Sequence, residues 1–287
     1  MTITAKVIAH SRAAGAPDLI TLQLRYPRFI HAEFMTHRVF SRNASSSRAI
    51  PIERMIQDVI DDPAMPVAWG SNKPGMQAGE EVDADTVWAS KIKWDQAMRS
   101  AVGSARSLAA GGLHKQICNR LLEPFAHISV VCTATDWDNF FDLRCHPGAD
   151  PTMRALAEAM RDAIAGSEPK NINPGWWHFP YVCETEWDSV RNTIRPDHGG
   201  LAPDGFVMER LALISAARCA RVSYLNHDGS NPDIEKDLHL AKRLLESKHM
   251  SPFEHQAVQE PQPIGGYLTS NFHWKWCQHR KMIEALS

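Results

Sequence analysis

Residues 36–48 of the chain read Thr-His-Arg-Val-Phe-Ser-Arg-Asn-Ala-Ser-Ser-Ser-Arg. These thirteen residues hold three arginines, one histidine, one asparagine and four serines, and none of them is acidic. Arginine binds phosphate oxygens in a bidentate manner, and hydroxyl groups and loop amides supply further donors. The segment therefore predicts a site for a small phosphorylated molecule, with a solvated polar loop as the alternative.

The sequence on both sides of this segment has the patterns of an α+β fold. Alternating apolar and polar residues predict strands at 2–10, 19–25 and 127–135. Helical periodicity predicts helices at 28–42, 86–109, 207–219 and 233–248, one that begins near Leu113 and stops at Pro124, and one that opens at Asp150-Pro151. Glycine and proline mark 62–85 and 167–206 as loops. We expect a mixed or antiparallel sheet packed with long helices.

Composition limits the classes of function that the chain can have. Its 287 residues suffice for one large domain or two small ones, and 44% hydrophobic and 22% charged residues are typical of a soluble globular protein. The net charge of −2 gives no electrostatic basis for general binding to nucleic acid. Scattered cysteines, the lack of a signal-peptide core and the lack of an apolar run of about 20 residues predict a cytoplasmic protein with no membrane contact.

Several common catalytic motifs are absent from the sequence. There is no GxGxxG fingerprint, no GxxxxGK phosphate loop, no GxSxG elbow and no HExxH pair. His273, Cys277 and His279 lie close together in the tail, but a structural zinc site normally needs four ligands. We therefore expect no metal site.

The segment at 36–48 resembles the RHRxxSxNxxSxR signature of the flavin-dependent thymidylate synthases. The residues in register are His37, Arg38, Ser41, Asn43, Ser46 and Arg48. Thr36 stands where the family has its first arginine, and Glu33 stands where it has a glutamine. Arg280 in the tail is our hypothesis for the charge that replaces the missing arginine.

Two further blocks resemble the same family. Arg120-Leu-Leu-Glu-Pro124 is similar to its RxxLP turn, Phe140-Phe-Asp-Leu-Arg144 to its FxxLR and Ala149–Arg154 to its AQxEIR helix start, with Asp150 in place of the glutamine. Ala220-Arg-Val-Ser-Tyr224 and His249-Met-Ser-Pro-Phe-Glu-His255 are similar to ARVS(Y/F) and HxSPFEH, which precede RHRxxS in ordinary members. We expect one circularly permuted domain over 1–287, with blocks at 25–51, 113–166 and 207–255.

The resemblance implies a role for each matching residue. Arg144 would be catalytic, because it would lie against the pyrimidine and stabilise the charge on the activated ring. The pyrimidine nucleotide would be bound by Glu33, Ser46, Ser47, Arg48, Arg120 and Arg144. FAD would be bound by His37, Arg38, Ser41, Asn43, Asn139, Ser223, His249, Ser251 and Glu254. A helix-end salt bridge is the alternative for Arg144, and a C-cap is the alternative for His249.

The activity implied by the resemblance is methylation of carbon 5 of dUMP to give dTMP. Methylenetetrahydrofolate would supply the carbon, FAD would be the cofactor, NADPH would reduce it, and the protein would be a homotetramer. An alternative with the same fold is hydroxymethylation, or a reaction on dCMP, in which Glu33 or Asp150 accepts a hydrogen bond from the cytosine amino group. A non-catalytic nucleic-acid binder is the alternative from another class, and the near-neutral charge opposes it.

Overall fold

The computed structural model describes residues 3–194, 203–222, 230–260 and 266–286. Its centre is a five-stranded sheet in the order β3-β4-β2-β1-β5. The strands are β1 (Thr4–Arg12), β2 (Leu19–Pro27), β3 (Ser41–Ala44), β4 (His127–Ala134) and β5 (Lys170–Asn171). All neighbours are antiparallel except β1 and β5, which pair in parallel over two residues. This mixed sheet confirms the predicted α+β class.

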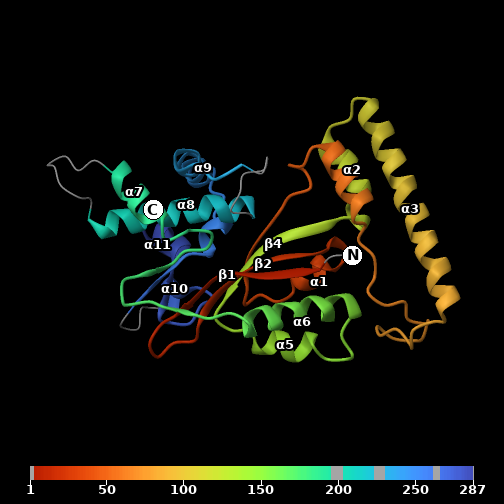
Figure 1. Ribbon diagram of the computed structural model, residues 1–287, viewed down its shortest axis with the longest axis horizontal. Coiled ribbons are helices and arrows are strands. Elements are labelled where there is room, and N and C mark those ends of the chain that lie inside the picture. The colour runs from red at the N-terminus through yellow and green to blue at the C-terminus, as the bar shows by residue number, and fades with distance from the viewer. Residues whose placement is uncertain (1–2, 195–202, 223–229, 261–265, 287) are drawn as a thin grey trace.

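Two helices, α5 (Asp138–Arg144) and α6 (Pro151–Ala165), cover one face of the sheet (Figure 1). Leu22 and Leu24 of β2 and Phe140 of α5 are buried in the same cluster as the apolar stripe of α6, Met153, Leu156, Ala157 and Met160. The carboxylate of Asp150 accepts hydrogen bonds from the backbone amides of Thr152 and Met153, both at 2.9 Å. The helix predicted to open at Asp150-Pro151 is thus confirmed.

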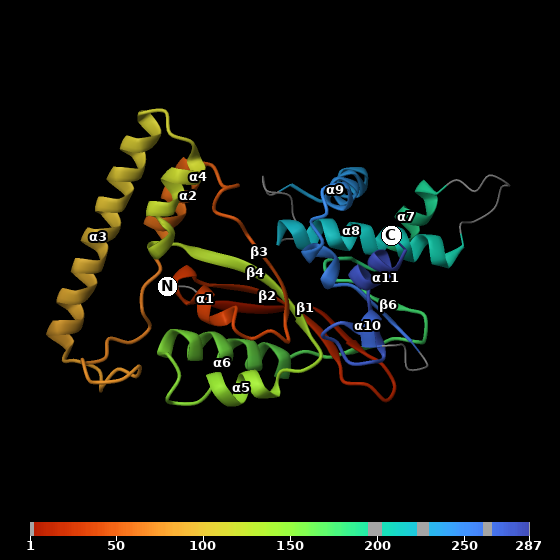
Figure 2. The same cartoon turned by 180° about the vertical axis from the view of Figure 1, so that it is seen from behind.

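Helices α2 (Ile52–Asp61) and α3 (Ala84–Ala110) lie at one end of the sheet (Figure 2). They bury Met55, Ile56, Met98 and Val102 against Phe125. The chain between α3 and β4 forms α4 (Lys115–Cys118) and the short 3-10 turns η2 (Asn119–Leu121) and η3 (Glu123–Phe125), so the predicted helix from Leu113 to Pro124 is broken into three turns.

The other end of the molecule holds the later part of the chain. Its helices are α7 (Glu186–Thr193), α8 (Asp204–Arg221), α9 (Ile234–Glu246), α10 (Gly266–Thr269) and α11 (His279–Ala285). A second, three-stranded antiparallel sheet has the order β6 (Trp177–His178), β7 (Ala257–Gln259) and β8 (Trp276–Gln278). The turn η4 (Ser251–Glu254) packs against β3 and thereby joins this end to the central sheet.

Two further predicted elements were wrong. Residues 28–42 were predicted as a helix, but they form η1 (Arg28–Ile30), α1 (His31–Phe34), two turns and the start of β3. The pairing of Ser41–Ala44 with β4 is a long-range interaction, which local periodicity does not reveal. The predicted loop at 167–206 contains β5, β6 and α7 and the first residues of α8.

No helix within the described ranges is both long enough and apolar enough to cross a bilayer.

Candidate functional site

The first group of predicted residues surrounds Arg144, the last residue of α5. Its Nη1 donates to Glu33 of α1 in an ion pair, and its Nε donates to Nε2 of His37 at 2.9 Å. His37 is 8% exposed and meets the edge of Phe140 at a centroid distance of 4.8 Å. The structure therefore brings Glu33, His37 and Arg144 together at the end of α5, where Arg144 forms a salt bridge with Glu33, which is the alternative stated for Arg144.

The protonation state of His37 follows from this geometry. Burial lowers its pKa, and the positive charges of Arg144 and Arg42 lower it further. Because Nε2 accepts the hydrogen bond from Arg144, the neutral imidazole carries its proton on Nδ1. Nη2 of Arg144 has no partner within the described residues, and the side chain is 21% exposed, so Arg144 retains a donor for a ligand.

The second group is built around Glu123, a residue that the sequence analysis did not single out. Its Oε1 accepts a hydrogen bond from Ser47 Oγ at 2.6 Å, and both of its oxygens lie 3.2 Å from Arg120 Nη1. Arg28 adds a further ion pair at 3.2 Å. Ser47 and Arg120 are thus engaged by a carboxylate. The three-residue spacing of Arg120 and Glu123 is the sequence signal for this pair.

Arg48 and Arg120 also line a shallow hollow beside α4. Leu108, Gln116, Ile117 and Leu121 form the rest of its wall. Arg48 is exposed and makes no ion pair with any residue that the structure describes. Two guanidinium groups in one hollow favour an anionic ligand such as a phosphate.

The third group lies where β3 meets η4 and α8. Asn43 Nδ2 donates to the carbonyl of Cys219 at 2.8 Å, and Ser251 Oγ donates to Asn43 Oδ1 at 3.1 Å. Ser41, 1% exposed, accepts hydrogen bonds from Asn271 Nδ2 and Gln278 Nε2, both at 3.2 Å. We call this contact between β3 and η4 the β3–η4 seam. It joins the segment at 36–48 directly to the HxSPFEH-like block.

The seam extends to Glu254 and Arg280. Gln278 Nε2 donates to the Glu254 carbonyl at 3.3 Å, and Arg280 forms ion pairs with the carboxylates of Glu254 and Glu284. Thr36, in contrast, donates its hydroxyl to the Glu33 carbonyl at 2.7 Å. The positive charges that lower the pKa of His37 are those of Arg144 and Arg42, whereas Arg280 pairs with Glu254.

The remaining predicted residues that the structure describes are exposed. Arg38, Ser46 and Asn139 lie on the surface and form no side-chain hydrogen bond with a described residue. His249 follows α9, where Lys248 has a positive φ of 56° and the His249 amide bonds the Leu244 carbonyl at 2.9 Å. This is a Schellman C-cap, in which the backbone of His249 ends the helix while its imidazole stays exposed. Ser223 lies outside the described residues.

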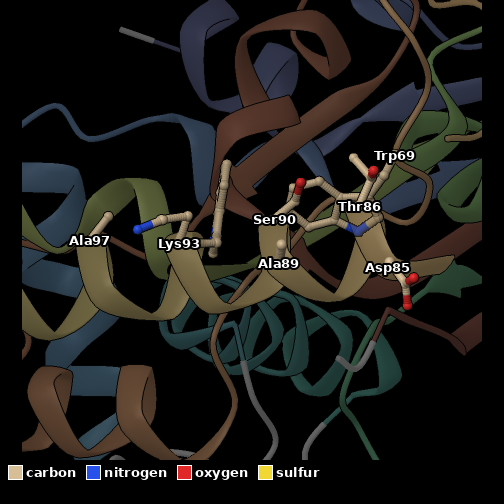
Figure 3. A pocket seen from close by; sticks show the side chains of 8 residues that line it. Trp69, Asp85, Thr86, Ala89, Ser90, Lys93 and Ala97 are labelled. Atoms are coloured by element: carbon tan, nitrogen blue, oxygen red, sulfur yellow. The ribbon is translucent and has the colours of Figure 1, made fainter. Parts of the chain in front are cut away.

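One further hollow contains none of the predicted site residues. A hollow of about 640 Å³ beside the first half of α3 is lined by Trp69, Asp85, Thr86, Ala89, Ser90, Lys93, Trp94 and Ala97 (Figure 3). Within the described ranges, no three histidine, cysteine or acidic side chains are grouped so as to hold a metal ion.

Comparisons with known proteins place this geometry in context. The model of the family described as thymidylate synthase complementing protein matches residues 18–170. Crystal structures of a UMP/dUMP methylase, PolB from Streptomyces cacaoi, are similar to the chain: the form bound with 5-Br dUMP has 17% identity and a TM-score of 0.48, and the form bound with 5-Br UMP has 18% and 0.45. Each match covers 57% of this chain and 90% or 89% of PolB. No curated protein sequence matches the chain.

Proposed function

Because the chain belongs to the family of thymidylate synthase complementing proteins, the flavin-dependent thymidylate synthases, we propose that it transfers a one-carbon unit from methylenetetrahydrofolate to carbon 5 of dUMP and so forms dTMP. The observation that carries this proposal is the family match over 18–170, which contains the groups around Arg144, Arg48 and Arg120. NADPH is the proposed reductant.

Arg144 is the proposed catalytic residue. Glu33 and the neutral His37 fix its guanidinium on one side, and Nη2 is left to donate to a pyrimidine carbonyl. A fixed cation at this position stabilises the negative charge that develops on the ring when carbon 5 reacts. Arg48, Arg120 and the exposed Ser46 would bind the 5′-phosphate, and Ser47 would support their loop through Glu123.

FAD is the proposed cofactor, and some of the residues predicted to bind it are exposed donors. Arg38, Asn139 and His249 are exposed, and they offer the cation and hydrogen-bond donors that a dinucleotide with a diphosphate requires. Ser41, Asn43 and Ser251 bond one another or the neighbouring chain, so their proposed role is to form the wall behind the cofactor. When bound, reduced FAD would supply the chemistry of hydride and one-carbon transfer.

The test is mass spectrometry of nucleotides after the purified protein is incubated with FAD, NADPH, methylenetetrahydrofolate, dUMP and dCMP together. We expect a methyl gain on dUMP. Arg144→Ala should lower the rate about a hundredfold, whereas Arg161→Ala, on the exposed face of α6, should retain it. If neither nucleotide changed while flavin was bound and reducible, dUMP would be excluded as the substrate.

Glu33 supports a second candidate function, a reaction on dCMP. Its carboxylate uses one oxygen for Arg144, and the other has no partner among the described residues, so it is available to a cytosine amino group. Glu33→Gln should then lower conversion of dCMP more than that of dUMP. Asp150 is not part of this candidate, because its side chain caps α6. A hydroxymethyl product would indicate the related nucleotide-modifying reaction.

We further propose that the chain is a permuted member of the family and a homotetramer. Support for permutation is the hydrogen bond between Ser251 and Asn43, which joins the late HxSPFEH-like block to the early one. An experimental structure in which 207–255 superposes on the first motifs of an ordinary member would establish it. Light scattering after size exclusion tests the tetramer, and a monomer at micromolar concentration would exclude it.

A further inference from the structure

A cavity of about 630 Å³ lies between β1 and the segment 167–187. Aromatic side chains of that segment, Trp176, Trp177, Phe179 and Trp187, supply much of its wall. Its lining includes none of the residues assigned above to nucleotide or cofactor, and all four of these aromatic residues lie beyond the residues 18–170 matched by the family model. We call it the β1 cavity.

The walls of the β1 cavity present flat aromatic surfaces. Trp176 stacks on Trp187 with centroids 5.4 Å apart and an interplanar angle of 18°, and Trp177 stacks on Phe179 at 5.8 Å and 4°. Trp176 is nevertheless 43% exposed. Half-exposed indole rings stack well on planar heterocycles, because every such ring offers a π face.

The strand β1 contributes unpaired backbone groups. On its outer edge β5 pairs only with Ser11 and Arg12, and no strand within the described ranges covers Val7, Ile8 or Ala9, which line the cavity. Alternating amide and carbonyl groups match the donor and acceptor edge of a nitrogen heterocycle.

Ser11, which also lines the cavity, begins a buried chain of hydrogen bonds across the sheet. Its Oγ lies 2.8 Å from His178 Nδ1, and His178 Nε2 lies 2.8 Å from Thr21 Oγ1. Thr21 Oγ1 lies 2.7 Å from Thr133 Oγ1, which lies 2.8 Å from His255 Nδ1. Ser11 is 6% exposed, and the other four residues are fully buried.

The protonation of His255, at the far end of this row of hydrogen bonds, fixes which atom is the donor in each of them. His255 Nε2 is buried and has no partner among the described residues. A buried N–H without an acceptor costs more than a bare lone pair, so His255 carries its proton on Nδ1 and donates to Thr133. Each hydroxyl then donates onward, and His178 donates from Nδ1 to Ser11. The Ser11 hydroxyl proton is therefore left over for an acceptor in the cavity.

We propose that the β1 cavity is a second ligand site, which binds a planar nitrogen heterocycle of the purine or pterin type. The ring stacks on Trp176, its edge pairs with the β1 backbone, and a ring nitrogen or carbonyl accepts the hydrogen bond from Ser11. Purines and pterins share this chemistry of a flat ring with a donor and acceptor edge. Binding at this site is independent of the methyl transfer proposed above.

The test is isothermal titration of the full-length protein with adenosine and, separately, with neopterin. We expect saturable binding of at least one probe, and the probe that binds identifies the source. Trp176→Ala should weaken binding about fivefold or more, and Ser11→Ala should weaken it about fivefold. Trp88→Ala, a tryptophan on α3 that is 68% exposed and lies outside the cavity lining, is the control and should change nothing.

Three results would overturn the proposal. The first is the absence of binding of either probe at millimolar concentration. The second is binding that Trp176→Ala leaves unchanged, since that binding would belong to another site. The third is the wrong tautomer of His255, which the imidazole nitrogen signals of the wild-type protein reveal by NMR. Protonation on Nδ1 of both His178 and His255 is expected, and a proton on His255 Nε2 would remove the donor at Ser11.

Discussion

At the scale of single residues, His37 reports on the environment of Arg144. Its pKa is lowered by burial first and then by the charges of Arg144 and Arg42. Arg144→Ala removes one of these charges, so the pKa of His37 should rise toward its ordinary value of about 6.5 while burial still holds it below that value. NMR titration of the imidazole protons measures the shift. Arg161→Ala is the control, and an unchanged pKa in Arg144→Ala would contradict the contact.

Asp150 caps α6, and the alternative reaction on dCMP also gave it a role in recognising the base; a substitution can separate these two roles. Loss of its side chain removes the cap of α6, so Asp150→Ala should lower the free energy of unfolding by about 1 kcal/mol. The preference between dUMP and dCMP should stay the same. Asp150→Asn, which retains a capping oxygen, should recover most of the stability in urea denaturation. A changed base preference in Asp150→Ala would restore a role in the site.

These residues also show what the sequence predicts well. The helix start at Asp150-Pro151 was predicted, because its cap bonds amides only two and three residues away, whereas the salt bridge of Arg144 was the alternative to its predicted catalytic role. Glu123 was missed, because its partners Ser47 and Arg28 lie far from it in sequence. Ser41 and Asn43 were predicted as ligand contacts, yet the structure shows them bonded to Gln278 and Cys219.

At the scale of elements, the packing of α8 on α9 depends on a buried ion-pair network. Arg218 and Asp237 are fully buried and bonded at 2.8 Å, and Glu186 and Arg221 complete the network. Asp237→Ala removes the buried carboxylate that Arg218 and Arg221 share and leaves Arg218 with Glu186 as a counter-charge, and it should cost about 3–5 kcal/mol of stability. Glu246→Ala on the same helix breaks only an exposed pair and should cost about 0–1 kcal/mol. Equal losses in the two variants, measured by denaturant unfolding, would disprove the difference.

Helices with complete local signals were predicted closely, and short strands were not. α3, α6 and α9 have caps and apolar stripes within one segment, which is why their predicted ranges agree with the structure. β3 has only four residues, and its pairing with β4 crosses more than eighty residues of sequence that periodicity does not connect. The two strands in 167–206, β5 and β6, have only two residues each, so glycine and proline determined the prediction of a loop.

At the scale of the whole molecule, buried neutral histidines should make the fold sensitive to acid. Burial lowers the pKa of His178 and His255 to about 3 and that of His127 and His279 to about 4. In the unfolded chain the value is about 6.5. Below that pH the unfolded state binds more protons than the folded state, so the free energy of unfolding falls as the pH decreases from about 6.5 toward 3.

Denaturant unfolding across this range of pH measures the effect. His178→Gln and His255→Gln should each show a smaller loss of stability between pH 6.5 and 4.5 than the wild-type protein. His239→Gln, at an exposed position on α9, is the control and should keep the wild-type slope. A slope that all three variants share with the wild type would assign the acid sensitivity to other groups.

The β3–η4 seam has a consequence for how the chain acquires its structure during synthesis. Asn43 and Ser251 are separated by 208 positions, whereas the strands of the central sheet other than β5 are complete once residue 134 has been made. The sheet therefore has the opportunity to assemble on the ribosome while β3 still lacks its cover. The time needed to synthesise about a hundred further residues, at about 5–20 residues per second, is on the order of ten seconds. During that interval β3 is exposed to other chains, and this is the step at which a chaperone would act.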